Sequence, residues 1–274
     1  MTAEREAALV TGASSGIGLE LARIFARHGN HLVVVARRAE KLEALKEELE
    51  SDFGIEVKVL VKDLSRPDAP REIYDELQEN GIRVGVLVNN AGMSVVDSFQ
   101  AADTSDIMSM VQVNVVALTE MTKLFVGPMV ERGRGRILNV ASVVSYYPTP
   151  RFATYGASKA FILSLTEALS EDLKGTGVTA TVLCPGYTKT EMIADTMNSS
   201  GLERWDRFIP SVWKMDASKV AKEGYRACMK GRSVHVSGVL NQVATEWVRH
   251  QPKWLVRNTG GIMSRIFTPA PRHD

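Results

Sequence analysis

The stretch T-G-A-S-S-G-I-G at residues 11–18 decides the fold of this 274-residue chain. It follows an apolar run that predicts a strand over residues 7–11, and it opens a segment that predicts a helix from about Ile17 to His28. Its glycines would let the backbone approach a pyrophosphate, and the helix N-terminus would offer free N–H groups. A tight turn that needs glycine for backbone reasons alone is the alternative. The location after the first strand of a βαβ unit favours phosphate binding.

Short β-type runs alternate with longer helical segments along the rest of the chain. Strands are predicted at 31–36, 56–62, 84–88, 136–140, 179–184 and 234–236, and helices near 39–53, 68–79, 104–131 and 217–230. Near-continuous Val and Leu in several strands indicates burial on both faces. The sequence therefore predicts an α/β fold with a doubly wound, Rossmann-type parallel sheet of about seven strands. We expect one domain over residues 1–240 and a partly helical C-terminal extension over 241–274, packed on the body or at a subunit interface.

The composition is that of an average globular protein, with 45% hydrophobic residues, 24% charged residues and a formal net charge of +1. This balance argues against nucleic acid as a partner. No apolar run is expected to reach the ~18–20 residues of a membrane span, and the first strand begins too early for a signal peptide. We therefore expect a cytoplasmic protein. The scattered histidines and two distant cysteines offer no metal-ligand spacing.

Tyr155 and Lys159 lie four residues apart in Y-G-A-S-K. On a helix this spacing places both side chains on one face, with Cβ atoms about 5–6 Å apart. A nearby cation favours the phenolate and lowers a tyrosine pKa from its usual ~10. The pair is therefore a candidate proton donor with its activating group, although most Tyr–Lys pairs at this spacing are solvated surface contacts. The stripe expected to bury this helix consists of Phe161, Leu165, Ala168 and Leu169.

The second predicted strand ends in V-V-V-A-R-R. An acidic residue here would accept hydrogen bonds from an adenosine ribose 2′-OH, whereas an arginine accommodates a 2′-phosphate. Ala36 is followed by Arg37 and Arg38, and arginine suits a bidentate phosphate contact. The pattern predicts NADP(H) as cofactor, with a solvated basic loop as the alternative. Ser15 brings no second cation from the glycine loop, so a moderate preference over NAD(H) is expected.

Together these features resemble the short-chain dehydrogenase/reductase family, in its NADP-preferring branch, over the chain to about residue 236. The motifs arrive in family order: T-G-A-S-S-G-I-G, Asp63-Leu64, N-N-A-G at 89–92, Asn114, Ser142, Tyr155 with Lys159, and P-G-Y-T-K-T at 185–190. The resemblance implies a catalytic set of Asn114, Ser142, Tyr155 and Lys159. It implies cofactor contacts, besides Tyr155 and Lys159, from Gly12, Ser14, Ser15, Gly16, Ile17, Gly18, Arg37, Arg38, Asp63, Leu64, Asn89, Ala91, Gly92, Pro185, Gly186, Thr188 and Thr190.

The resemblance also implies roles for single residues. Asp63 would contact adenine, Asn89 the cofactor, and Thr188 the nicotinamide. Asn114 would hold a water in a proton relay, or else only satisfy backbone groups. The expected reaction is hydride transfer between NADP(H) and a carbonyl or secondary alcohol.

Within that reaction, Ser142 would hydrogen-bond the carbonyl oxygen, with Ser145 as a rival three residues on. Tyr155 would protonate the same oxygen. Lys159 would lower the pKa of Tyr155 and anchor the nicotinamide ribose.

Bulky apolar residues between 187 and 215 suggest that the substrate is a hydrophobic ketone, aldehyde or acyl compound, although packing or a subunit contact explains them equally well. The segment from Trp247 to His273 carries five Arg/Lys and no Asp or Glu. Packing on the body or on a second subunit is favoured there over a membrane contact. We expect a homo-oligomer, a dimer or a tetramer. The rival from another class is a catalytically idle NADP(H)-sensing or lipid-associated protein on the same fold.

Overall fold

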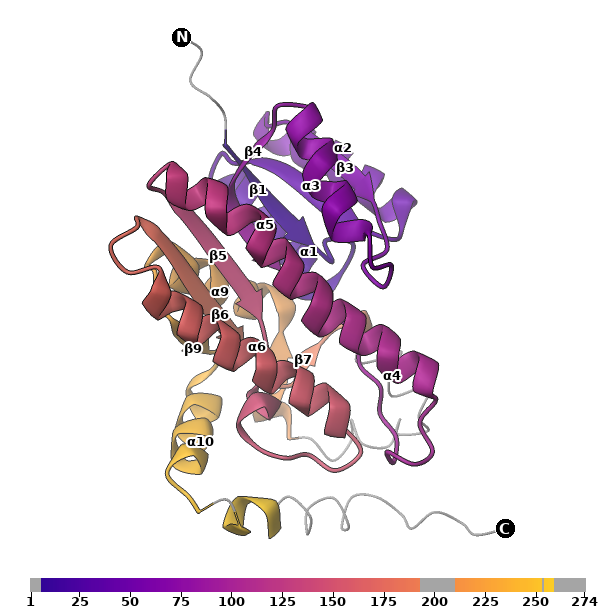
Figure 1. The fold of residues 1–274 in the computed structure, drawn as a ribbon, viewed down its shortest axis with the longest axis vertical. Coiled ribbons are helices and arrows are strands. Elements are labelled where there is room, and N and C mark those ends of the chain that lie inside the picture. The colour runs from indigo at the N-terminus through magenta and orange to yellow at the C-terminus, as the bar shows by residue number, and fades with distance from the viewer. Residues whose placement is uncertain (1–5, 193–209, 253, 259–274) are drawn as a thin grey trace.

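A computed structural model describes residues 6–192, 210–252 and 254–258, and its centre is a parallel sheet (Figure 1). Seven strands are paired in the order β3-β2-β1-β4-β5-β6-β9. Their bounds are β1 Glu6–Thr11, β2 His31–Ala36, β3 Val57–Val61, β4 Arg83–Asn89, β5 Gly135–Val140, β6 Val178–Cys184 and β9 Val234–Val236. A separate parallel pair joins β7 (Thr188–Lys189) to β8 (Met215–Asp216). The predicted fold class and strand count are confirmed.

The strand order reverses at β1, which lies between β2 and β4. Leu9 pairs with Val33 on one side and with Leu87 on the other. In open parallel sheets of this kind, the crevice beyond the carboxyl ends of such strands is where ligands bind. Thr11 and Asn89 end β1 and β4, so the glycine loop and the N-N-A-G motif meet at this crevice.

Helices cover both faces of the sheet, as its Val- and Leu-rich strands require. One layer holds α1 (Gly16–Arg27), α2 (Ala39–Phe53) and α9 (Ala217–Met229), with Phe25 fully buried at its centre. The other layer holds α3 (Ala69–Glu79), α5 (Leu118–Glu131) and α6 (Ala153–Asp172), with Met121 and Met129 fully buried. Removing a buried aromatic such as Phe25 typically costs about 3–5 kcal/mol. These two layers hold the crevice in place.

One continuous helix runs from α4 (Thr104–Val111) through a π-helical turn, η1 (Gln112–Ala117), into α5, as Figure 1 shows. It spans Thr104–Glu131, 28 residues, and contains an 18-residue window of mean hydropathy 1.3. The expectation that no apolar run reaches membrane-spanning length is therefore wrong for this helix by length and composition. Of that window, 44% is buried inside the protein. Its apolar side chains pack on β4 and α3, as in a core helix.

The chain after the sheet forms α10 (Val239–Arg249), which packs by one face only. Asn241 and Thr245 are buried on its inner face, and Asn241 Nδ2 donates to the Ser237 carbonyl at 2.8 Å. The outer face exposes Val243 and Trp247, one turn apart. A helix was expected in this part of the chain, although it begins before the predicted boundary at residue 241.

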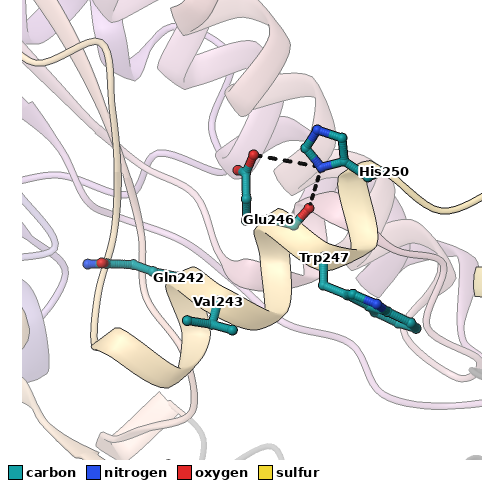
Figure 2. A pocket seen from close by; sticks show the side chains of 5 residues that line it. All are labelled: Gln242, Val243, Glu246, Trp247 and His250. Atoms are coloured by element: carbon teal, nitrogen blue, oxygen red, sulfur yellow. Dashed lines mark hydrogen bonds and ion pairs between the residues drawn. The ribbon is translucent and has the colours of Figure 1, made fainter.

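A hollow of about 640 Å³ lies along α10, and Figure 2 shows the five side chains that line it. Its walls come from this single helix, so the hollow is an open surface feature. There the His250 Nδ1–H donates to the Glu246 carbonyl oxygen at 2.8 Å. The hollow is lined by Gln242, Val243, Glu246, Trp247 and His250, none of which is a predicted site residue.

Candidate active site

The glycine loop joins β1 to α1 in a conformation that only glycine allows. Gly12 and Gly16 have φ angles of +67° and +57°, a region that side chains rarely adopt. A Cβ on Gly18 would lie 2.3 Å from the Gly12 carbonyl oxygen. Ser15 makes no side-chain cap, and no acidic residue lies in the first turn of α1. The positive end of α1 is therefore free of internal anions and suits a phosphate.

Two residues outside the predicted set, Thr11 and Asn90, fix this loop to β4. The Thr11 hydroxyl accepts from the backbone N–H groups of Asn90 and Ala91, each at 3.0 Å, and donates to the Val88 carbonyl at 3.2 Å. Asn90 Nδ2 donates to the carbonyl oxygen of Thr11 at 3.0 Å. Thr11 belongs to T-G-A-S-S-G-I-G and Asn90 to N-N-A-G. Their places in these motifs could have identified both residues from the sequence.

Asn89 has a different place from the one predicted for it. Its side chain is buried and donates to Thr122 Oγ1 at 3.0 Å and to Asn139 Oδ1 at 2.9 Å. Asn139 in turn donates to Thr166 Oγ1 at 2.9 Å. The Asn89 amide thus ties β4 and β5 to α5 and α6 in the interior. A direct side-chain contact between Asn89 and the cofactor does not fit this geometry.

Asp63 and Leu64 follow β3 at the same edge of the sheet. Asp63 Oδ1 accepts from the Ser65 N–H at 3.0 Å, and Leu64 is buried in the core. The aspartate therefore closes a local turn near the crevice, where its predicted adenine contact stays a prediction.

Tyr155 and Lys159 occupy the first two turns of α6 and share one face, as predicted. The Lys159 ammonium lies 5.7 Å from the centroid of the Tyr155 ring and donates to the Val140 carbonyl at 3.0 Å. The predicted core stripe is wrong in part, because Phe161 is 41% exposed. The face of α6 that is buried instead consists of Ser158, Lys159, Ile162, Leu163 and Thr166. Three of these are polar, which is why apolar periodicity did not find them.

The protonation states of the pair follow from burial. Burial raises the pKa of Tyr155 to about 12, and a hydrogen bond with Ser142 acts in the opposite direction. Burial also lowers the pKa of Lys159 to about 8. Burial dominates the net shift in the Tyr155 pKa, and the Lys159 ammonium donates to Val140, so the predicted lowering of the Tyr155 pKa by Lys159 stays a prediction. At neutral pH Tyr155 keeps its proton and Lys159 is mostly charged.

Ser142 stands at the start of a 3₁₀ turn, η2 (Val143–Tyr146), after β5. Its hydroxyl accepts from the Val144 N–H at 3.3 Å and also bonds Tyr155. The rival Ser145 has a buried hydroxyl with no partner in the described part of the chain. The contact with Tyr155 favours Ser142 as the serine of the site.

Asn114 lies in the π-helical turn η1, a feature frequently found at functional sites. Its amide is fully buried, accepts from the Met93 N–H at 2.9 Å, and donates to the Met93 carbonyl at 2.9 Å and to Ser158 Oγ at 3.0 Å. The Ser158 hydroxyl donates to the Tyr155 carbonyl at 2.7 Å. The side chain of Asn114 therefore positions the Tyr155 turn. The predicted water would have to be held by other atoms of this residue.

The P-G-Y-T-K-T segment borders the same crevice. Thr188 is buried and donates from Oγ1 to the Gly186 carbonyl at 2.9 Å. A Cβ on Gly186 would lie 2.1 Å from Asn241 Nδ2, so α10 packs directly on this segment. A Cβ on Gly92 would lie 3.3 Å from Asn114 Oδ1 and 3.5 Å from Lys159 Nζ. Gly92 therefore keeps a space open beside Lys159.

Arg38 lies at the mouth of the glycine loop. Its guanidinium donates to Ser14 Oγ at 2.9 Å and to Ser15 Oγ at 2.8 Å. Arg37 is exposed and has no ion-pair partner within residues 6–192, 210–252 and 254–258. The structure thus joins Arg38, rather than both arginines, to the loop.

The comparisons with known proteins agree on one family. The model of the short chain dehydrogenase family matches residues 6–200. The chain is 35% identical over 206 residues to 17-beta-hydroxysteroid dehydrogenase type 3 of Rattus norvegicus, covering 74% of this chain but only 66% of that protein. It is 40% identical over 185 residues to sulfoacetaldehyde reductase 2 of Chromohalobacter salexigens, covering 67% and 73%. A short-chain dehydrogenase from Sphingobium yanoikuyae, solved in complex with NADPH, matches with a TM-score of 0.79 and 31% identity over 98% of this chain and 100% of that one.

Proposed function

The chain belongs to the short-chain dehydrogenase family, and from this membership we propose that it is an NADPH-dependent reductase of carbonyl compounds. The observation that carries the proposal is the cluster of Ser142, Tyr155 and Lys159 beside the crevice that the glycine loop borders. A protein that only senses a nucleotide has no need of a buried proton donor at this place.

The residues of the crevice fit NADP(H). The uncapped N-terminus of α1 suits the pyrophosphate, and the Arg38 guanidinium suits a 2′-phosphate. Ala36 offers no carboxylate to a 2′-OH. Gly92 leaves room next to Lys159, whose ammonium would meet the nicotinamide ribose. When bound, NADPH supplies the hydride that reduces the carbonyl carbon.

The protein's own task is to hold the carbonyl oxygen and give it a proton. Tyr155 is protonated at neutral pH, so it can act as the acid without a preceding ionisation. Ser142 contacts Tyr155 and can donate its own hydrogen bond to the same oxygen. Lys159 favours the phenolate that forms when the proton leaves, because its ammonium is close to the ring and poorly solvated. Proton transfer by a positioned acid typically contributes about 10²–10⁴-fold.

We propose a hydrophobic ketone or aldehyde as the substrate. Support comes from Met192, whose Cε lies 3.8 Å from where a Gly92 Cβ would stand, and from Val212 and Trp213, which are exposed. The likeness to a hydroxysteroid dehydrogenase points the same way. The likeness to a sulfoacetaldehyde reductase favours a small polar aldehyde as the second candidate.

NADPH oxidation in the presence of a carbonyl panel tests the proposal. The panel contains steroid ketones, aromatic ketones, acyl thioesters, alkyl aldehydes and sulfoacetaldehyde, each measured with wild-type protein and with Tyr155→Phe. We expect turnover of at least one bulky hydrophobic carbonyl by the wild type only. Tight NADPH binding without turnover of any member would instead indicate an idle sensor.

A further inference from the structure

Two cations at the start of α2 share one carboxylate from a distant part of the chain. Arg38 Nη1 lies 2.6 Å from Glu191 Oε2, and Lys41 Nζ lies 2.7 Å from Glu191 Oε1. All three side chains are close to half exposed. The hydrogen bonds from Lys41 and Arg38 lower the pKa of Glu191 to about 2, so its carboxylate is ionised throughout the neutral range.

The residues next to Glu191 lie across the mouth of the crevice. The methyl group of Thr190 would be 3.1 Å from a Cβ on Gly16, in the glycine loop. The Met192 methyl would be 3.8 Å from a Cβ on Gly92, beside Lys159. Residues 190–192 therefore form a strap that reaches from the glycine loop toward the catalytic lysine, and Glu191 fastens it to α2.

The Glu191 carboxylate lies between Arg38 and Lys41, the two cations from which a phosphate dianion could also accept hydrogen bonds. The Arg38 guanidinium already bonds the Ser14 and Ser15 hydroxyls of the glycine loop, which adds further donors around the same point. A carboxylate that accepts from both cations competes with a second anion for their N–H donors and their positive charge. A phosphate that approached Arg38 and Lys41 would also lie next to the Glu191 carboxylate, and the two negative charges would repel each other.

We propose that Glu191 is an internal occupant of the 2′-phosphate position, displaced when NADPH binds, and that Lys41 is the second cation of that position. The inference rests on the proposed NADPH-dependent function. It makes Glu191 a specificity-tuning residue, because its carboxylate opposes the phosphorylated cofactor and leaves NADH unaffected. It also couples cofactor binding to the attachment of the strap, because only a ligand that carries the 2′-phosphate displaces Glu191 from Arg38 and Lys41.

The test is equilibrium binding of NADPH, NADH and adenosine 2′-monophosphate, measured by calorimetry at one low, fixed salt concentration. Glu191→Gln keeps the shape of the side chain and removes its charge. Glu48→Gln is the matched control, because Glu48 also accepts from a partly exposed arginine, Arg23, at 2.7 and 2.8 Å, but away from the crevice. Lys41→Met tests the second cation.

Exposed ion pairs are individually weak, so Glu191→Gln should bind NADPH and adenosine 2′-monophosphate roughly three- to tenfold more tightly. NADH affinity and the Glu48→Gln control should not change, and Lys41→Met should weaken only the two phosphorylated ligands. Unchanged or weaker NADPH binding by Glu191→Gln would overturn the inference while leaving the reductase proposal intact. Wild-type protein that binds NADH but neither phosphorylated ligand would overturn the proposed cofactor, and the inference with it.

Discussion

The two ends of the crevice differ in how far their charged side chains are buried. Tyr155 and Lys159 lie at the buried end, and Arg38 and Lys41 lie at the exposed edge. Lys159 is 5% exposed, and burial sets its pKa and that of its neighbour Tyr155. Arg38 and Lys41 are 43% and 45% exposed and paired with an exposed carboxylate. Interactions between charges are strong in a desolvated site and screened at a surface. Substitutions at the buried end should therefore have large effects on turnover or on stability. Substitutions at the exposed edge should change cofactor affinity by small factors.

The largest effect is expected from Tyr155→Phe. The change removes the proton donor and keeps the ring, so turnover should fall by about 10²–10⁴-fold while NADPH affinity stays within a few-fold of wild type. Single-turnover kinetics and calorimetric titration measure the two quantities separately. A variant that keeps more than a few per cent of turnover, on a substrate whose chemical step limits the rate, would show that Tyr155 is not the acid.

Asn114→Ala should be the next most damaging change, and its effect should be on stability. It leaves the part-buried N–H and carbonyl of Met93 and the buried Ser158 hydroxyl without their shared partner. A loss of about 2–4 kcal/mol in the free energy of unfolding is expected, measured by urea denaturation. Ser158→Ala removes one of these bonds and the donation from Ser158 to the Tyr155 carbonyl, but keeps both Met93 contacts, so it should cost less. Equal costs for the two variants would mean that the Met93 contacts contribute no more than the bond from Ser158 to the Tyr155 carbonyl.

Lys159→Met tests the buried charge through pH. The folded-state pKa of about 8 lies below the ordinary 10.5, so between these values the unfolded chain binds more protons and wild-type stability gains with rising pH. Below pH 8 the cost of the buried cation is constant. The stability advantage of Lys159→Met over wild type should therefore be greatest at pH 7 and shrink by about 2–3 kcal/mol toward pH 10.5. Urea denaturation at pH 7, 8, 9 and 10 measures it, and a difference independent of pH would contradict the account.

The smallest effects should come from the arginines of the exposed edge. Arg38→Ala should weaken NADPH binding by about tenfold, because one charge-assisted contact is worth roughly 1.5 kcal/mol or somewhat more. Arg37→Ala should weaken it less, since Arg37 makes no contact with the glycine loop in the described residues. NADH affinity should change in neither variant. Titration at fixed salt decides the order, and a larger effect at Arg37 would reassign the phosphate contact.

The fold could be predicted from the sequence almost completely, because it rests on local patterns. Strand and helix periodicity located all seven strands of the sheet, and the glycine motif located the crevice. The order of the motifs located Ser142, Tyr155 and Lys159, which the structure brings together.

Long-range polar contacts could not be predicted in the same way. The partners of Asn89 lie 33 and 50 residues away, and the partners of Glu191 lie 150 and 153 residues away. The spacing of residues within a motif or a helix gives no information about partners so far apart in the sequence. The polar buried face of α6 escaped prediction because hydrogen bonding, and not apolar periodicity, selects Ser158 and Thr166 for the interior.

Transfer of label from NADPH to product shows whether the protein catalyses hydride transfer to a carbonyl carbon with Tyr155 as the acid. NADPH carrying deuterium at C4, prepared separately as each of its two stereoisomers, is incubated with wild-type protein and the best carbonyl of the panel, and the alcohol is examined by mass spectrometry. We expect one deuterium on the carbinol carbon from one stereoisomer only, and about 10²–10⁴-fold less labelled alcohol with Tyr155→Phe in the same time. Alcohol formed without deuterium from either stereoisomer, or equal labelling by Tyr155→Phe, would contradict this expectation.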